Sequence, residues 1–153
     1  MICWDTCKDD FRDDGSLRDI YITPATLADW QALYPILRAY SGAEYSVAGV
    51  VQPPPDSVER AFADRPSGSP MLRLRVGRAL IVFHFFSDEE VECDFVPNEI
   101  TSQGDLDTLL AFVRRLGDTT RRRVVITPEN GRELAFITYD PESGNFEHPG
   151  IAA

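Results

Sequence analysis

The segments ALIVFHFF (residues 79–86) and EEVECDFV (residues 89–96) decide the fold of this chain. Both are rich in aromatic and β-branched residues, which favour strands. The first segment is apolar at almost every position, as in a strand that is covered on both faces. The second alternates, so that Val91, Cys93 and Phe95 face one way while Glu92 and Asp94 face the other. We therefore predict two neighbouring antiparallel strands with a row of negative charge on one side.

The length of the turn between these strands fixes which residue lies opposite His84. If residues 87–89 form a three-residue turn, His84 lies opposite Glu92, and the apolar side chains of both strands share one face. A turn with an even number of residues would instead place His84 against Val91 or Cys93, among apolar neighbours. Both registers remain open from the sequence.

Further elements surround this pair and predict the fold class. Helices are indicated by three- and four-residue apolar spacing over residues 27–40 and 102–116, with a shorter one from residue 56 to 63. Strands are indicated over residues 17–23, 45–51, 71–76, 122–127 and 134–139. The order β-α-β-α-β-β-β-α-β-β, with short connections, predicts an α+β domain: a mainly antiparallel sheet with the helices packed on one face. Residues 1–153 form one domain, with an N-terminal segment at 1–13 and an irregular tail at 141–153.

Start and stop signals delimit the two long helices. Thr26 with Asp29 forms a capping-box pattern, and Ser102 with Asp105 marks the next helix start. Pro35 lies within the first helical pattern and is expected to kink or divide that helix. Gly117 is expected to end the second helix.

The composition excludes several classes of partner. The 153 residues carry a net charge of −10, which disfavours binding to nucleic acids and to anionic membrane surfaces. No stretch is long and apolar enough to span a membrane, and the first residues lack the pattern of a signal peptide, so we expect a cytoplasmic protein. The acidic residues are clustered: residues 88–99 contain six acidic side chains and no basic one.

No catalytic or cofactor-binding motif occurs in the chain. It lacks a nucleophile elbow, a phosphate-binding glycine loop and zinc-ligand spacing, so we expect no cofactor and no metal. Cys3 and Cys7 lie close in sequence without a second pair to complete a zinc site, and whether they form a disulfide stays open. Cys93 is expected to point into the core, where burial and flanking carboxylates disfavour its thiolate.

Three segments resemble a group of small, acidic bacterial proteins. They are DGSLRDIYITPATLADW (residues 14–30), FHFFSDEEVECDFVP (residues 83–97) and TPENGRELAFITYDPESG (residues 127–144). Some proteins of this kind are similar to immunity proteins of bacterial toxin systems. The resemblance by itself implies no particular activity; an immunity protein that acts by occlusion is the most specific form of the binding role that follows.

The clustered charge and the missing motifs favour a non-catalytic acidic protein that binds a basic protein partner. We expect the partner-binding residues to be Asp88, Glu89, Glu90, Glu92 and Asp94. One alternative is a small enzyme that uses His84 with Glu92 or Asp94 as an acid/base set. Another is an accessory domain that self-associates, so a homo-oligomer stays possible.

Overall fold

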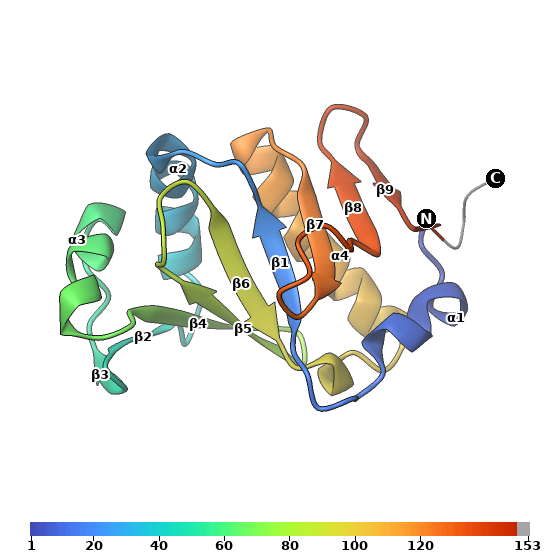
Figure 1. Cartoon of the computed structure of the whole chain (residues 1–153), viewed down its shortest axis with the longest axis horizontal. Helices are drawn as coiled ribbons and strands as arrows, with labels where there is room; N and C mark the ends of the chain where they lie inside the picture. The colour runs from blue at the N-terminus through green and yellow to red at the C-terminus, as the bar shows by residue number, and fades with distance from the viewer. Residues whose placement is uncertain (150–153) are drawn as a thin grey trace.

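The computed structural model describes residues 1–149, which form one antiparallel sheet with helices against it (Figure 1). The strands are β1 (Arg18–Ile22), β2 (Glu44–Val47), β3 (Val50–Gln52), β4 (Met71–Val76), β5 (Ala79–His84), β6 (Val91–Phe95), β7 (Val124–Pro128), β8 (Ile137–Asp140) and β9 (Asn145–Glu147). The α-helices are α1 (Trp4–Cys7), α2 (Leu27–Arg38), α3 (Val58–Ala63) and α4 (Gln103–Thr120). The strand order is β3-β2-β4-β5-β6-β1-β7-β8-β9, which confirms the predicted α+β class with an antiparallel sheet.

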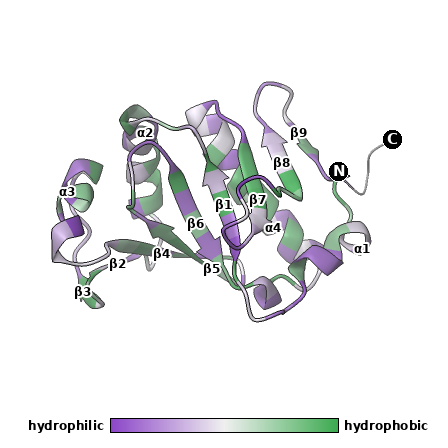
Figure 2. Ribbon diagram, in the orientation of Figure 1, coloured by the Kyte–Doolittle hydropathy of each residue, from purple (hydrophilic) through white to green (hydrophobic). Residues whose placement is uncertain are grey.

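Helices α2 and α4 lie behind the central strands in Figure 1 and cover one face of the sheet. The strands turn their apolar side chains toward them, and Figure 2 shows apolar and polar bands alternating along the central strands. Trp30 of α2 packs against Phe85, and Phe112 of α4 packs against Phe83, all four being buried. Within residues 1–149, no helix covers the central strands on the opposite face, which is turned toward the viewer in Figure 1. Over residues 1–149, no helix has the length and apolar character needed to cross a bilayer.

Of the two registers that the sequence left open for the central hairpin, the structure has the one expected from a three-residue turn. His84 pairs with Glu92 and Phe83 pairs with Cys93, so the apolar residues of β5 and β6 share the covered face. Cys93 is buried in the core as expected. The polar residues of β6 therefore lie on the helix-free face.

The predicted helix starts are also confirmed. The Thr26 hydroxyl accepts a hydrogen bond from the Asp29 amide, and the Asp29 carboxylate accepts one from the Thr26 amide. The Ser102 hydroxyl likewise accepts from the Asp105 amide. These bonds satisfy amide groups that a helix terminus would otherwise leave without partners.

Neither expected helix break occurs. Helix α2 is not divided at Pro35, which lies on the exposed side, where water can solvate the carbonyl group that proline leaves without a donor. Helix α4 continues past Gly117 to Thr120 and ends at Arg121, which has a left-handed backbone conformation (φ 59°). Gly117 serves packing instead, because a Cβ atom there would lie 2.5 Å from a ring carbon of Tyr139.

Two strands were missed. Residues 45–51 were expected to form one strand, but Ala48 and Gly49 make a turn between β2 and β3, both with positive φ. Strand β9 lies inside the tail that was expected to be irregular from residue 141, and it pairs with β8. The remainder of that tail, residues 150–153, lies outside the described residues.

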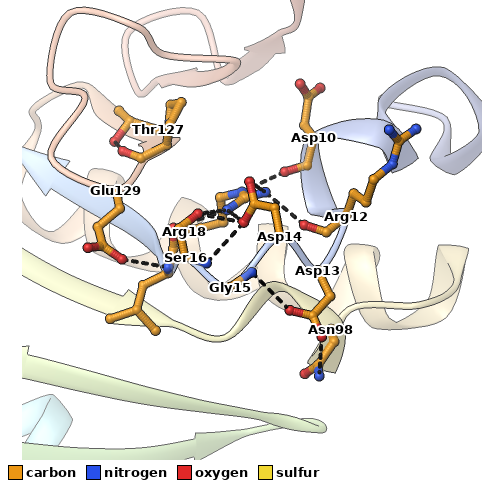
Figure 3. Close-up of polar contacts among 12 residues, drawn as sticks. Asp10, Arg12, Asp13, Asp14, Gly15, Ser16, Arg18, Asn98, Thr127 and Glu129 are labelled. Atoms are coloured by element: carbon orange, nitrogen blue, oxygen red, sulfur yellow. Dashed lines mark hydrogen bonds and ion pairs between the residues drawn. The ribbon is translucent and has the colours of Figure 1, made fainter.

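The N-terminal segment belongs to the packed core, since Ile2, Cys7 and Phe11 are at most 3% exposed. Arg18 fixes this segment to β1 (Figure 3). Its guanidinium group donates to the backbone carbonyls of Asp10 and Arg12 and to the Asp14 carboxylate. Hydrogen bonds from Ser16, with a further one from Arg18, hold the pKa of Asp14 well below its usual range.

Candidate functional site

The helix-free face of the sheet gathers four carboxylates from two neighbouring strands and the turn before one of them. Asp19 of β1 lies directly across from Asp94 of β6, and Tyr21 lies across from Glu92. Alternation along each strand places these residues on the same face, and Glu90 precedes β6. We call the set Asp19, Glu90, Glu92 and Asp94 the acidic strip.

His84 lies beside the acidic strip on β5. Its Nε2 atom is 2.7 Å from Oδ2 of Asp94, and its ring stacks on Phe86 with centroids 4.9 Å apart. Glu92 lies across from His84 in the register, but Asp94, the diagonal neighbour, makes the hydrogen bond. The histidine side chain is 16% exposed. The arrangement orients the imidazole ring and can transfer a proton between histidine and carboxylate.

Arg132, from the loop between β7 and β8, lies over the acidic strip. Its Nε and Nη2 atoms donate to the two carboxylate oxygens of Glu90, each at 2.7 Å, and Nη2 lies 3.4 Å from Glu92. Its guanidinium carbon is 4.6 Å from the centroid of the Tyr21 ring, a cation–π contact. The hydrogen bonds from Arg132 lower the pKa of Glu90.

Asp19 of β1 anchors the loop that carries Arg132. Its Oδ2 atom accepts hydrogen bonds from the Tyr21 hydroxyl and from the Asn130 amide, both at 2.7 Å. Burial raises the pKa of Asp19, and burial also raises the pKa of Glu92, to which the charges of Asp19 and Glu90 add. Negative charge is thus concentrated where solvent is largely excluded.

The sequence predicted only part of this arrangement. Glu90, Glu92 and Asp94 do lie near His84, but their side chains are only 13–19% exposed, with Arg132 and His84 as partners. Asp19 was identifiable as a polar residue within a predicted strand. Arg132 gave no local signal, because it is 40 residues from Glu92 and only the loop path brings it there.

Asp88 and Glu89 differ from the other predicted site residues because they are exposed. They lie in the turn between β5 and β6, where the Glu89 amide donates to the Ser87 hydroxyl. Within residues 1–149, neither carboxylate makes an ion pair. Phe86, next to them, is 57% exposed, which is unusual for a phenylalanine. We call Phe86, Asp88 and Glu89 the acidic turn.

The next candidates are metal binding and thiol chemistry among residues 1–149. No group of three or more His, Cys, Asp or Glu side chains within residues 1–149 is arranged to hold a metal ion. Cys3, Cys7 and Cys93 are free thiols, which answers the open question about Cys3 and Cys7. Burial raises the pKa of Cys7 to about 11 and that of Cys93 well above its usual value. Neither buried thiol is suited to act as a nucleophile.

A cavity of about 450 Å³ adjoins the acidic turn. Its lining residues are Thr23, Pro24, Ala25, Ser87, Glu89 and Glu90. Another cavity, of about 650 Å³, lies between α4 and β9 and is lined by Arg114 and Phe146 among others. Of the two, only the first contains residues of the acidic turn and the acidic strip.

No family model, curated protein or solved structure matches this chain. The resemblance to small bacterial immunity proteins therefore stays a prediction. Any functional assignment rests on the chemistry of the helix-free face and of the turn beside it.

Proposed function

We propose that this chain is a non-catalytic binding protein that docks a basic protein partner at the acidic turn and the adjoining acidic strip. In its most specific form the proposal is that of an immunity protein, which neutralises a basic toxin or effector by covering its working surface. One observation supports it above the others: Asp88 and Glu89 are exposed and without ion-pair partners in the described chain, beside a phenylalanine that is 57% exposed.

The composition of the acidic turn suits a protein interface. Exposed charges of one sign accelerate the encounter with a partner of opposite charge and help select it. An exposed aromatic ring supplies the apolar contact area that dominates many binding energies. The net charge of −10 favours a cationic partner and disfavours phosphate backbones.

The proposal is tested by titrating the protein with the product of the neighbouring gene in a calorimeter. We expect binding that weakens as salt is raised, because exposed charges are screened. The double variant Asp88→Asn, Glu89→Gln should weaken binding at low salt by about tenfold, equivalent to about 1.4 kcal/mol.

A matched control separates the turn from general charge effects. Glu142→Gln with Glu147→Gln removes the same charge from exposed positions elsewhere, and it should leave the affinity within about twofold. Absence of binding at low salt, or equal weakening by both double variants, would contradict the proposed docking site.

A second candidate function rests on the hydrogen bond between His84 and Asp94. A histidine oriented by a carboxylate at 2.7 Å is a common acid/base arrangement. On this hypothesis, any hydrolytic or transfer activity found for the protein should be lost in His84→Ala. An activity that persists in that variant would remove the enzyme hypothesis.

A further inference from the structure

The Arg132 side chain contacts the acidic strip with the geometry typical of arginine recognition by a protein site. Its planar guanidinium group donates two parallel hydrogen bonds to Glu90, both at 2.7 Å, and lies over the ring of Tyr21 at 4.6 Å. A two-pronged bond to a carboxylate together with aromatic stacking is specific to arginine, because lysine has neither the fork nor the plane. The side chain of Arg132 is nevertheless 46% exposed, so it lies at the surface of the strip.

The loop that carries Arg132 is held by other bonds. The Asn130 amide donates to Asp19 at 2.7 Å, and Glu129 accepts from the Leu17 amide at 2.7 Å. The Phe136 amide donates to the Ile126 carbonyl at 3.0 Å, where the loop returns to the sheet. These bonds involve neither the Arg132 side chain nor Glu90, so the loop has anchors that do not depend on the guanidinium group.

Negative charge on the strip exceeds the positive charge beside it. Four carboxylates, those of Asp19, Glu90, Glu92 and Asp94, face one arginine and one histidine. Even with His84 protonated, the ionised strip would carry more negative than positive charge. Burial is the main reason why the pKa values of Asp19 and Glu92 are raised, and the neighbouring carboxylates add to the rise. A second cation would therefore be stabilised here.

We propose that Glu90 and Glu92 of the acidic strip form, with the Tyr21 ring, an arginine-binding site, which Arg132 occupies in the free protein and yields to an arginine of the partner. The inference rests on the proposed function, because it assumes a basic protein partner. Arg132 acts as an internal competitor. In its presence, the apparent affinity for a partner arginine equals the affinity of the empty site multiplied by the fraction of time for which the site is empty.

The test uses a fluorescent tetra-arginine peptide and fluorescence anisotropy. Arg132→Gln removes the competing guanidinium and should tighten binding about tenfold if the site is free about a tenth of the time in the parent protein. A tetra-lysine peptide should gain less than threefold, because its ammonium groups cannot form the two-pronged bond. Adding Glu90→Gln to Arg132→Gln should abolish the gain.

Arg38→Gln is the matched control for charge. Arg38 pairs with Asp56 at 3.1 Å on another surface, so this variant changes the net charge equally without touching the strip. It should shift the tetra-arginine affinity by less than twofold. Arg132→Lys, which keeps the charge, should give an intermediate gain. Circular dichroism and the exchange rate of the Asn130 amide report whether the loop stays folded in each variant.

The outcomes distinguish this inference from the proposed function. An equal gain in Arg132→Gln and Arg38→Gln, or no gain in either, would overturn the arginine site. The neighbouring gene product could then still bind through the acidic turn. If Arg132→Gln gains affinity for tetra-arginine while that gene product does not bind at all, the site stands and the proposed partner is wrong.

Discussion

Glu92 shows how a single carboxylate on the helix-free face affects stability. Its side chain is 13% exposed, and burial with the charges of Asp19 and Glu90 raises its pKa above the ordinary value of 4.5. A carboxyl group whose pKa is higher in the folded state disfavours folding when it is ionised, and this cost disappears as the pH falls through the folded pKa. Glu92→Gln should therefore raise the urea midpoint at pH 8.

The size of that gain should depend on pH. Between pH 8 and pH 4, the difference between Glu92→Gln and the parent should shrink, because the parent glutamate becomes protonated and loses the same cost. Glu142→Gln, at an exposed position, should show no such trend. A lower urea midpoint for Glu92→Gln at pH 8 would mean that the contact of Glu92 with Arg132, at 3.4 Å, outweighs the burial of its charge.

Residue by residue, the sequence predicted side-chain direction better than side-chain partners. Alternation grouped Glu92 with Asp94 on one side of their strand, but the turn length, and with it the register against His84, was settled only by the structure. The sequence could not show that Arg132 covers the acidic strip, because this contact depends on where the loop between β7 and β8 runs over the sheet. A contact between side chains 40 residues apart follows from the order of the strands in the sheet, and the sequence contains no periodic pattern that indicates it.

At the scale of elements, long periodic segments were predictable and short ones were not. The capped starts of α2 and α4 and the two strands of the central hairpin have strong local signals. The turn at Ala48 and Gly49 was missed because alanine rarely adopts a positive φ, although Gly49 offered a clue. Strand β9 has three residues, too few for an alternating pattern to be recognised.

The contact between α4 and β8 gives a prediction at this scale. Gly117 lies against Tyr139, whose ring is fixed between Arg114 and Phe146, with the Arg114 guanidinium carbon at 5.1 Å and the Phe146 ring at 4.8 Å from its centroid. Because the ring cannot easily move, Gly117→Ala should lower the free energy of unfolding by about 1–3 kcal/mol. Chemical denaturation measures this change.

Gly104 provides the same substitution in the same helix without a clash. A Cβ atom there would meet only the Ser102 hydroxyl, at 3.8 Å. Because alanine favours helical backbone more than glycine does, Gly104→Ala should be neutral or stabilising by up to about 1 kcal/mol. If both variants were destabilised equally, loss of helix geometry rather than the approach to Tyr139 would be the cause.

At the scale of the whole molecule, the two faces of the sheet have separate tasks. The covered face holds the packed core, to which the N-terminal segment contributes Phe11, 3% exposed and in contact with the rings of Phe95 and Phe136. The helix-free face holds charged residues whose pairing costs stability or adds little to it. Stability and binding should therefore respond to different substitutions.

Two phenylalanines test this separation directly. Phe11→Ala should lower the free energy of unfolding by about 3–5 kcal/mol, because it leaves a cavity in the core that its neighbours fill only in part. Phe86→Ala, at a position 57% exposed, should lower it by less than about 1 kcal/mol while weakening partner binding, since its ring belongs to the acidic turn. Urea denaturation and calorimetric titration of the same two proteins compare the effects. If Phe86→Ala lost stability as Phe11→Ala does, the acidic turn would be a structural element, and its exposed aromatic ring would no longer support a docking role.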